Sequence, residues 1–482
     1  MILRRAAAPL LGLSMLLAAA PAAAGADVLR QVEAYTPELR RLALDIWRNP
    51  ELGYLEQSAS ALLQDALRRE GFEVESGIAG MPTAFVARAG RRGRGPVIAL
   101  LAEMDALPGA SQAAEPVRQP VQGQDAGHAC GHNLFGPASV AAAVAVRRWL
   151  ESSGVDGELR VYGTPAEEGG SGKVYMVRAG LFDDVDVVLH WHPDSENSAA
   201  QSTSKANVSG KFRFEGVASH ASVSPERGRS ALDGVEALNF MANLMREHVP
   251  EGTRIHYTIS DGGGAPNVVP ARAEVYYYVR HQDHRVVQDV FARLQRAAEG
   301  AAAGTGTTVA WESLGGVYGL LPNDALGRVA DAALRQVGGV NYSPADRAFA
   351  EAMQAGFERK PPLEQAAAIG PYRADDEWQA STDVGDVSWV VPTVGVRTAT
   401  WVPGSAAHSW QATAASGHDI GLKGAGVAAG ALALTAVQLY REPAVAEAAR
   451  REFDARRGEG FQYRPLLTRE TPPLDYRRPA RP

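Results

Sequence analysis

Apolar residues recur at helical spacing early in the chain and then give way to short continuous apolar runs. Two segments, VLRQVEAYTPELRRLALDIW (28–47) and SASALLQDALRREG (58–71), carry an apolar residue every three or four positions, which predicts two helices. The run GPVIALLAEMDALPG (95–109) follows and ends in acidic residues and a Pro-Gly turn. It predicts a buried strand that delivers Glu103 and Asp105 at its carboxyl end.

The same order of apolar run, polar strand end and helix repeats further along the chain. Strand patterns in GELRVYGTPAEEGG (157–170) and VDVVLHWHP (185–193) alternate with helical segments at 137–151 and 173–180. Strands that alternate with helices are typical of an α/β domain with a mostly parallel sheet, whose sites lie beyond the carboxyl ends of the strands. The histidine and carboxylate clusters of this part of the chain fall at those strand ends.

The pattern changes between residues 208 and 316 to strand, helix, strand, strand, helix and strand. This β-α-β-β-α-β order is that of a ferredoxin-like unit, which we interpret as an inserted second domain. A strand and turn at 391–404 and a long Ala/Gly/Leu helix at about 421–440 then follow. We therefore expect an α/β catalytic domain of residues 27–207 and 317–445, an inserted domain of residues 208–316, and a charged tail of residues 446–482 that forms a helix and then an extended strap.

The first 26 residues have the order of a secretory signal peptide. Arg4 and Arg5 precede the apolar run LLGLSMLLAAA, and the small residues PAAAGA follow, so cleavage is expected after Ala24 or Ala26. A membrane anchor is the alternative, but the run is shorter than the roughly 20 apolar residues that a spanning helix needs. We expect a periplasmic or secreted protein that is free of the membrane once residues 1–26 are removed.

The composition argues against nucleic acid as a partner, and it includes a single cysteine whose thiol needs protection. The 482-residue chain is 45% hydrophobic and has a formal charge of −7, so nucleic acid is not an expected partner. Its single cysteine, Cys130, cannot form an internal disulfide and lies between two histidines in GHACGHN (127–133). In an oxidising compartment such a thiol is exposed to oxidation unless it is buried or bound to a metal.

Side chains that bind metals occur at five places, in strand ends or turns. Each alone has an ordinary interpretation, because a histidine on an apolar strand is more often a core residue and a Glu-Glu pair more often lies in solvent. Their coincidence with glycine-rich strand-to-loop junctions favours a site for a divalent cation such as zinc, manganese or cobalt. The five places are Cys130 with His128 and His132, Glu167 with Glu168, His190 with His192, Asp383 with Asp386, and His408.

Glu167 and Glu168 are adjacent in TPAEEGGSG, so in an extended segment their carboxylates point in opposite directions. One can therefore bind a metal while the other faces a substrate, which is the division between ligand and general base in a metal hydrolase. His190 and His192 are two residues apart in a predicted strand and share a face. Their spacing does not decide which of them is the ligand.

Six motifs in order resemble the M20 family of metallopeptidases and amidohydrolases, most of all its aminoacylase-like branch. They are GHACGHN, TPAEEGGSGKVYMV, LHWHP, VASHASVSPERGRSALDGVE, GGGAPNVVPARAEVYYYVR and PGSAAHSWQ. The resemblance covers roughly residues 30–440. It implies a zinc-peptidase-like α/β fold, in which a mixed sheet has helices on both faces, with an inserted ferredoxin-like α+β domain for lid closure and dimerisation.

The resemblance also implies a two-metal centre for zinc or manganese. Cys130 would be the thiolate shared by both ions, and Glu167 the general base and later the proton donor. The chain departs from the wider family at Glu103-Met104-Asp105, where many members have a His-x-Asp ligand histidine, and at Asn133, where an aspartate is common. Asp105 is expected to orient a ligand from behind. The implied ligands are Cys130, His132, Glu168, His192 and His408.

In the inserted domain the resemblance gives three residues a role at the substrate. His220 in ASHAS would stabilise the oxyanion, in its own site or in that of a partner subunit. Asn267 and Arg280 would bind a substrate carboxylate or carbonyl, since an arginine suits a bidentate carboxylate contact. A turn-capping asparagine and a solvated strand-end arginine are the alternatives.

The implied activity is hydrolysis of the amide bond of an N-acyl or N-aroyl amino acid. The first candidate is p-aminobenzoyl-glutamate, cleaved to p-aminobenzoate and glutamate. Auxin–amino acid conjugates, other N-acyl amino acids and dipeptides are the alternatives. We expect a homodimer, or a heterodimer in which the chain needs a homologous subunit for activity.

Overall fold

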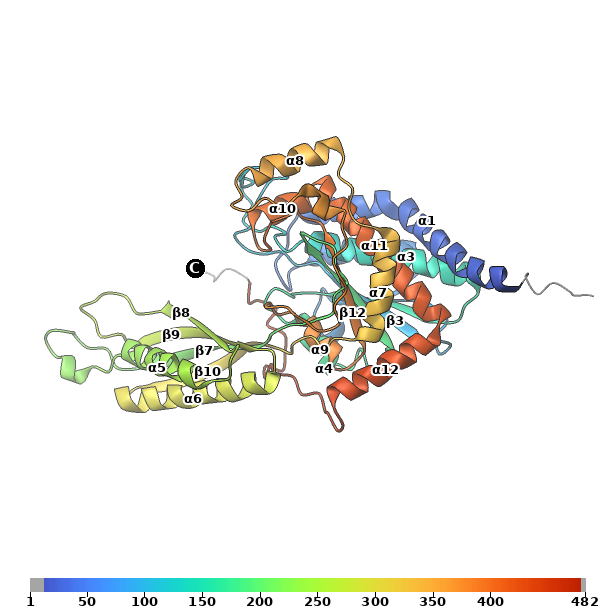
Figure 1. The fold of residues 1–482 in the computed structure, drawn as a ribbon. Coiled ribbons are helices and arrows are strands. Elements are labelled where there is room, and N and C mark those ends of the chain that lie inside the picture. The colour runs from blue at the N-terminus through green and yellow to red at the C-terminus, as the bar shows by residue number, and fades with distance from the viewer. Residues whose placement is uncertain (1–12, 478–482) are drawn as a thin grey trace, which may run out of the picture.

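The computed structural model describes residues 13–477 and has a six-stranded mixed sheet at its centre (Figure 1). The strand order is β1-β2-β4-β3-β5-β12, and β4, β3, β5 and β12 run parallel. β2 is antiparallel to both of its neighbours, so the sheet is mixed as expected. The strands are β1 (Glu73–Ser76), β2 (Phe85–Gly90), β3 (Val97–Glu103), β4 (Glu158–Thr164), β5 (Val187–Asp194) and β12 (Thr393–Ala399).

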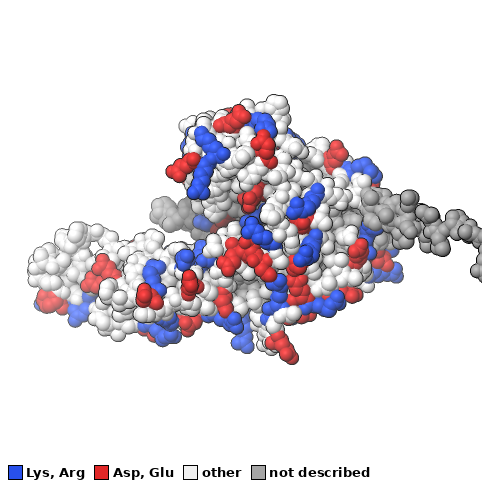
Figure 2. Space-filling model, viewed as in Figure 1, with Lys and Arg blue, Asp and Glu red and all other residues white. Residues whose placement is uncertain are grey.

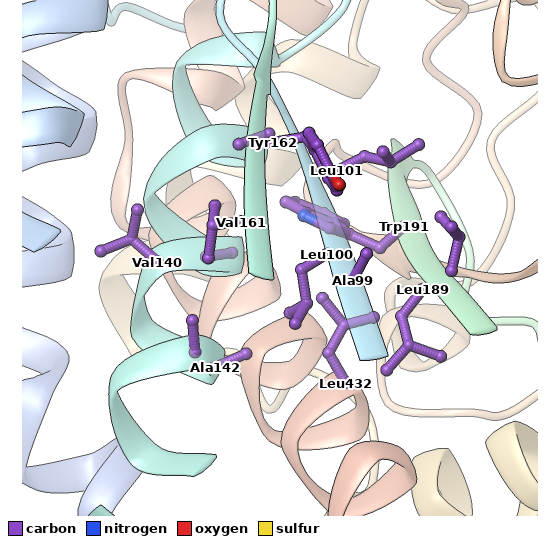
Figure 3. Packing of buried hydrophobic residues seen from close by; sticks show 14 of the residues in the cluster. Ala99, Leu100, Leu101, Val140, Ala142, Val161, Tyr162, Leu189, Trp191 and Leu432 are labelled. Atoms are coloured by element: carbon purple, nitrogen blue, oxygen red, sulfur yellow. The ribbon is translucent and has the colours of Figure 1, made fainter. Parts of the chain in front are cut away.

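The central strands are buried and apolar because both faces of the sheet are covered. Figure 3 shows Leu100 and Val161 of the sheet beside Val140 and Leu432, which belong to two covering helices. Successive side chains along a strand point to opposite faces. Tyr162 therefore faces the other way, where its ring centroid lies 4.7 Å from that of Phe182.

Three long helices build the apolar core on one face of the sheet. They are α1 (Leu13–Arg48), α3 (His132–Ser153) and α11 (Asp419–Arg441), and each packs against the other two. By length and composition α11 could cross a membrane, but 83% of that apolar window is buried inside the protein. It is thus a core helix of the folded domain.

The predicted signal segment, residues 1–26, lies partly outside the described residues, which begin within α1. Val28 is the first fully buried apolar side chain of the described core. Ala24, at the first predicted cleavage position, is partly buried and also packs against this core.

A four-stranded antiparallel sheet with two helices forms the inserted domain, which we call the lid (residues 206–317). Its strand order, β10-β7-β9-β8, and its element order are those of the predicted ferredoxin-like unit. In Figure 1 the lid projects from the rest of the molecule. Its elements are β7 (Ala206–Glu215), α5 (Ala231–Met245), β8 (Arg254–Asp261), β9 (Arg272–His281), α6 (His284–Thr305) and β10 (Thr308–Val317).

Shorter elements complete the fold, and the last residues that the structure describes form a segment without helix or strand. We call this segment, residues 458–477, the C-terminal strap; it follows a charged helix, α12 (Pro443–Arg457). The other elements are α2 (Gln57–Arg69), α4 (Gly172–Arg178), β6 (Ser202–Thr203), α7 (Asp324–Val337), α8 (Pro344–Gln354), β11 (Asp376–Glu377), α9 (Val384–Ser388) and α10 (Trp410–Ser416).

Candidate metal centre

Donor side chains from distant parts of the chain meet at the carboxyl edge of the central sheet. Cys130 and His132 lie at the start of α3, Glu168 follows β4, His192 is in β5, and His408 precedes α10. β4 and β5 both run parallel to β3, so their carboxyl ends reach the same edge. This is the edge at which α/β sheets bind their ligands.

The five donors form two groups that share the thiol of Cys130. In one group the donor atoms of Cys130, His132 and His192 all lie within 4.8 Å of one another. In the other group the same is true of Cys130, Glu168 and His408. A cation with bonds of about 2.0–2.3 Å to sulfur, nitrogen and oxygen fits within each group. The geometry therefore suits two cations with the thiolate between them.

Backbone conformations with positive φ present these donors. Gly131 lies between Cys130 and His132 with a φ of +76°, and a Cβ there would lie 2.8 Å from the side chain of Pro193. His408, although not a glycine, has a φ of +59°. Such conformations persist where the surrounding fold enforces them, and they cluster at functional sites.

Asp105 orients two of the donors from behind. Its Oδ1 lies 3.0 Å from His132 Nδ1, and its Oδ2 accepts a hydrogen bond from the Glu168 main-chain N–H at 2.9 Å. His192 is held in a similar way, because its Nδ1 lies 2.7 Å from the Pro193 carbonyl oxygen. An imidazole held through Nδ1 presents Nε2, and His192 Nε2 lies 3.5 Å from the Cys130 sulfur.

The charge balance of the centre fits divalent cations. His132 Nε2 and Glu103 Oε2 are 3.1 Å apart, yet within the described residues neither atom has a hydrogen bond of acceptable geometry. Buried polar atoms without a partner are rare, and a shared cation would account for them. The centre also gathers five carboxylates and a thiol around one ammonium group: Glu103, Asp105, Glu167, Glu168, Asp383, Cys130 and Lys173.

Burial makes the charged forms of the reactive groups costly while the protein is free of metal. Burial raises the pKa of the Cys130 thiol well above its ordinary value, and the Glu168 carboxylate raises it further. Burial and the carboxylates of Glu103 and Glu168 raise the Glu167 pKa in the same way. A bound cation reverses this balance for a coordinating thiol, which it deprotonates.

A buried lysine beneath the centre was not singled out by the sequence analysis. Lys173 is fully buried, and its Nζ lies 2.6 Å from Asp383 Oδ1 and 2.8 Å from Glu103 Oε1. Burial alone would lower the Lys173 pKa, but the two carboxylates hold it above its ordinary value. The lysine thus stays charged and fixes Glu103 at the floor of the centre.

Lys173→Met is expected to destabilise the metal-free protein by about 3–5 kcal/mol, because two buried carboxylates lose their counter-charge. Lys211→Met is the matched control: Lys211 lies 2.8 Å from Glu274 with 30% of its side chain exposed. That partly exposed pair is worth less than about 1 kcal/mol. Denaturant unfolding of the two variants measures the difference, and equal stabilities would show that the buried network does not support the centre.

The centre opens into a cavity of ≈ 470 Å³ between the α/β domain and the lid. Arg280, at the end of β9, is the predicted substrate-binding residue that reaches it. The Arg280 Nη1 donates to Ser381 Oγ at 3.3 Å, and the guanidinium lies 5.2 Å from the centre of the Tyr278 ring. The predicted metal-centre residues that line the cavity are Cys130, Glu167, Glu168, His192 and His408.

His220 and Asn267 do not line this cavity, so the structure does not bring them to the substrate site of their own chain. They lie together at the far end of the lid, where His220 pairs with Val268 and the Asn267 carbonyl accepts from Ala221 N–H at 3.0 Å. Asn207, near the start of β7, lines the cavity. Ser209 is the last β7 residue that lines it, and the end of the strand lies about 20 Å further on at ~3.3 Å per residue.

The remaining candidate donors lie outside the two groups. His128 is buried and His190 is half-buried; desolvation lowers the pKa of each imidazole to about 3, so both are neutral. Asp383 lines the cavity and pairs with Lys173. Asp386 instead accepts a hydrogen bond from the Tyr463 hydroxyl at 2.7 Å, which ties it to the C-terminal strap.

Comparisons with known proteins agree with this geometry. Residues 203–305 match the M20 peptidase dimerisation domain. The chain is 39% identical over 449 residues to a subunit of the p-aminobenzoyl-glutamate hydrolase of Escherichia coli (strain K12), and the match covers 87% of this chain and 93% of that protein. It is 32% identical to the Xaa-Arg dipeptidase of Mus musculus, over 88% of this chain and 90% of that protein.

A solved structure shares the fold at low sequence identity. The crystal structure of a putative aminohydrolase from methicillin-resistant Staphylococcus aureus superposes with a TM-score of 0.64 at 18% identity, covering 86% of this chain and 99% of that one. The relatives at 39% and 32% identity confirm the family that the six motifs indicated. The chain belongs to the M20 family of metal-dependent peptidases and amidohydrolases.

Proposed function

We propose that this protein hydrolyses the amide bond of an N-acyl or N-aroyl amino acid with a free carboxylate. The principal substrate that we propose is p-aminobenzoyl-glutamate. One observation carries the proposal: the two donor groups that share Cys130 open into the same cavity as Glu167 and Arg280. The similarity to a component of a p-aminobenzoyl-glutamate hydrolase supports the substrate.

The ligand set fits two divalent cations per chain, which when bound polarise the amide carbonyl and acidify a water. Glu167 accepts the proton of the attacking water and passes it to the leaving nitrogen. Glu167 lines the same cavity as the donor groups, so its carboxylate can reach both the attacking water and the leaving nitrogen. The thiolate ligand favours zinc, whereas the carboxylate ligands of the centre are also compatible with manganese.

Two features of the cavity suit an N-aroyl amino acid. Arg280 can bind the free carboxylate with two parallel hydrogen bonds. Trp378 also lines the cavity, with its ring centroid 6.1 Å from that of His192. The Arg397 guanidinium lies 4.4 Å from the Trp378 ring and holds it in place. A flat indole beside the metal ligands offers a stacking surface for an aromatic acyl group.

The test uses the mature protein, stripped with chelator and reloaded with zinc or manganese. Chromatography should show release of p-aminobenzoate and glutamate from p-aminobenzoyl-glutamate, and chelator should abolish it. A panel of an auxin–amino acid conjugate, an N-acetyl amino acid and a dipeptide ranks the alternatives. Absence of p-aminobenzoate despite bound metal would contradict the substrate and leave the panel to identify another.

We propose that the protein acts as a dimer through its lid, with itself or with a homologous subunit. Apolar side chains of the lid are exposed to solvent, an arrangement that often marks an interaction surface. Figure 2 shows a broad uncharged surface at the far end of the lid. A partner docked there would bring its own His220 and Asn267 toward this cavity. The exposed large apolar side chains of the lid are Val217, Val223, Phe240, Met241, Leu244, Ile259, Val268 and Trp311.

Mixing two inactive variants tests this arrangement in the homodimer. His220→Ala removes the oxyanion contact and Glu167→Gln removes the base. If His220 acts across the interface, one site in each mixed dimer is intact, and a random 1:1 mixture recovers about a quarter of wild-type activity. Co-refolded protein assayed for hydrolysis gives the answer. No recovery, in mixtures shown to contain mixed dimers, would place both residues in the same site.

We also propose that the protein is exported and that residues 1–26 are removed. Export supports a role in cleaving conjugates outside the cytoplasm before their uptake. The intact mass and N-terminal sequence of the protein from fractionated cells test this. A full-length protein confined to the cytoplasm would contradict it.

A further inference from the structure

The C-terminal strap is anchored to both domains before it reaches the metal centre. The Tyr463 hydroxyl donates to Asp386, and the Arg178 Nη1 donates to the Arg469 carbonyl oxygen at 2.6 Å. Between these points Leu466 is buried in the lid core and the next residue, Leu467, in the α/β core. The strap therefore has a defined path along the junction of the two domains.

The last described residues of the strap contact a metal-centre residue. The Tyr476 hydroxyl and the Arg477 Nη2 donate to the same Glu168 carbonyl oxygen, at 3.2 Å and 2.7 Å. The Tyr476 ring packs edge-on against Tyr54 with centroids 5.7 Å apart, which fixes the strap end. The Arg477 side chain lines the cavity that holds Cys130 and Glu168.

Among the described residues that line this cavity, Arg477 and Arg280 are the two arginines and none is a lysine. They come from different parts of the fold, since Arg280 lies on β9 of the lid and Arg477 on the strap. The Glu168 carbonyl oxygen accepts one hydrogen bond from Tyr476 and one from Arg477. This contact uses only one of the five N–H donors of the Arg477 guanidinium. The arginine can therefore hold Glu168 and bind an anion at the same time.

We propose that Arg477 is a specificity-determining residue that binds the side-chain carboxylate of an acidic amino acid, while Arg280 binds its α-carboxylate. This inference rests on the proposed function, because it assigns the second anion of that same substrate class. A cavity with two guanidinium groups favours an N-acyl glutamate or aspartate over an analogue with a neutral side chain. The strap thus links the C-terminus to substrate selection.

Arg477→Gln tests the assignment in the metal-loaded mature protein. We expect kcat/KM for p-aminobenzoyl-glutamate to fall about 10- to 100-fold through KM, the loss for one charge-assisted hydrogen-bonding partner. The value for p-aminobenzoyl-glutamine should fall far less, so the preference between the two substrates collapses. Arg464→Gln makes the same charge change on an exposed residue of the strap and should keep the wild-type preference.

Tyr476→Phe separates substrate binding from positioning of Glu168. It removes one hydrogen bond to the Glu168 carbonyl but leaves the guanidinium in the cavity, so the glutamate preference should survive. If Arg477→Gln lowers kcat/KM for both substrates equally, Arg477 only positions Glu168 and the proposal fails. It also fails if the wild-type protein shows no preference for glutamate over glutamine.

A binding measurement keeps this inference separate from the proposed function. Isothermal titration of the metal-loaded protein with L-glutamate and L-glutamine needs no turnover. Tighter binding of glutamate that Arg477→Gln abolishes supports the inference even if p-aminobenzoyl-glutamate is not cleaved, in which case only the proposed acyl group is wrong. Equal binding of the two amino acids would overturn it.

Discussion

Replacing Cys130 with alanine is expected to remove both cations and to lower kcat/KM by about 10³-fold or more, since metal polarisation is worth several kcal/mol of transition-state stabilisation. The physical reason is that its thiol belongs to both donor groups. Each group would keep two of its three ligands. Elemental analysis of the purified variant and its rate of hydrolysis measure the effect.

The control for Cys130→Ala is the stability of the metal-free proteins. Cys130 is small and buried, so the variant and the wild type should unfold at similar temperatures in chelator. Added metal should raise the unfolding temperature of the wild type alone, because a ligand stabilises only the folded protein that binds it. A variant that retains two cations per chain would show that the thiol is not shared.

Glu167→Gln is expected to lower kcat by about 10²–10⁴-fold while both cations remain bound, because the change removes the general base and leaves the two donor groups that share Cys130 complete. Glu167 also lies in a third group of possible donors, with Glu103 and His132. The metal-free variant should be at least as stable as the wild type. Its neutral amide replaces a carboxylate whose pKa is raised by burial and by neighbouring carboxylates. Steady-state kinetics with metal analysis tests both parts.

Glu168→Gln is the matched contrast, because the two glutamates are adjacent and the substitution is the same. Glu168 belongs to a donor group, and its Oε1 lies 3.0 Å from His408 Nε2. We therefore expect Glu168→Gln to lose metal together with activity. If Glu167→Gln loses metal and Glu168→Gln retains it, the roles of the two residues are reversed.

Periodicity in the sequence predicted most of the elements that position the centre. The strands around Leu100, Val161 and Leu189 are continuous apolar runs, and such runs stand out because a sheet covered on both faces needs no polar side. β1 and β2 gave no such signal, since β1 is a largely exposed edge strand with the pattern EVES. Periodicity therefore did not place the antiparallel strands, although the family resemblance implied a mixed sheet.

The donors of the centre were recognisable because their residue types and glycine-rich surroundings are visible in the sequence. Lys173 was not, since a lysine after SerGly at a helix start is ordinarily solvated, and only the fold places Glu103 and Asp383 around it. Arg477 contacts Glu168, which lies about 300 positions earlier in the chain, so no local pattern indicates this contact. His220 and Asn267 lie in recognisable sequence motifs. Their distance from the cavity depends on the length and direction of β7, which no local sequence pattern indicates.

X-ray diffraction from crystals of the metal-loaded protein, measured at the absorption edge of zinc or manganese, tests the central claim most directly. We expect two anomalous peaks about 3.5–4 Å apart, on either side of the Cys130 sulfur. One peak should lie among Cys130, His132 and His192, and the other among Cys130, Glu168 and His408. A single peak, or a peak held by Glu103, His132 and Glu167 instead, would contradict a centre built on the shared thiol.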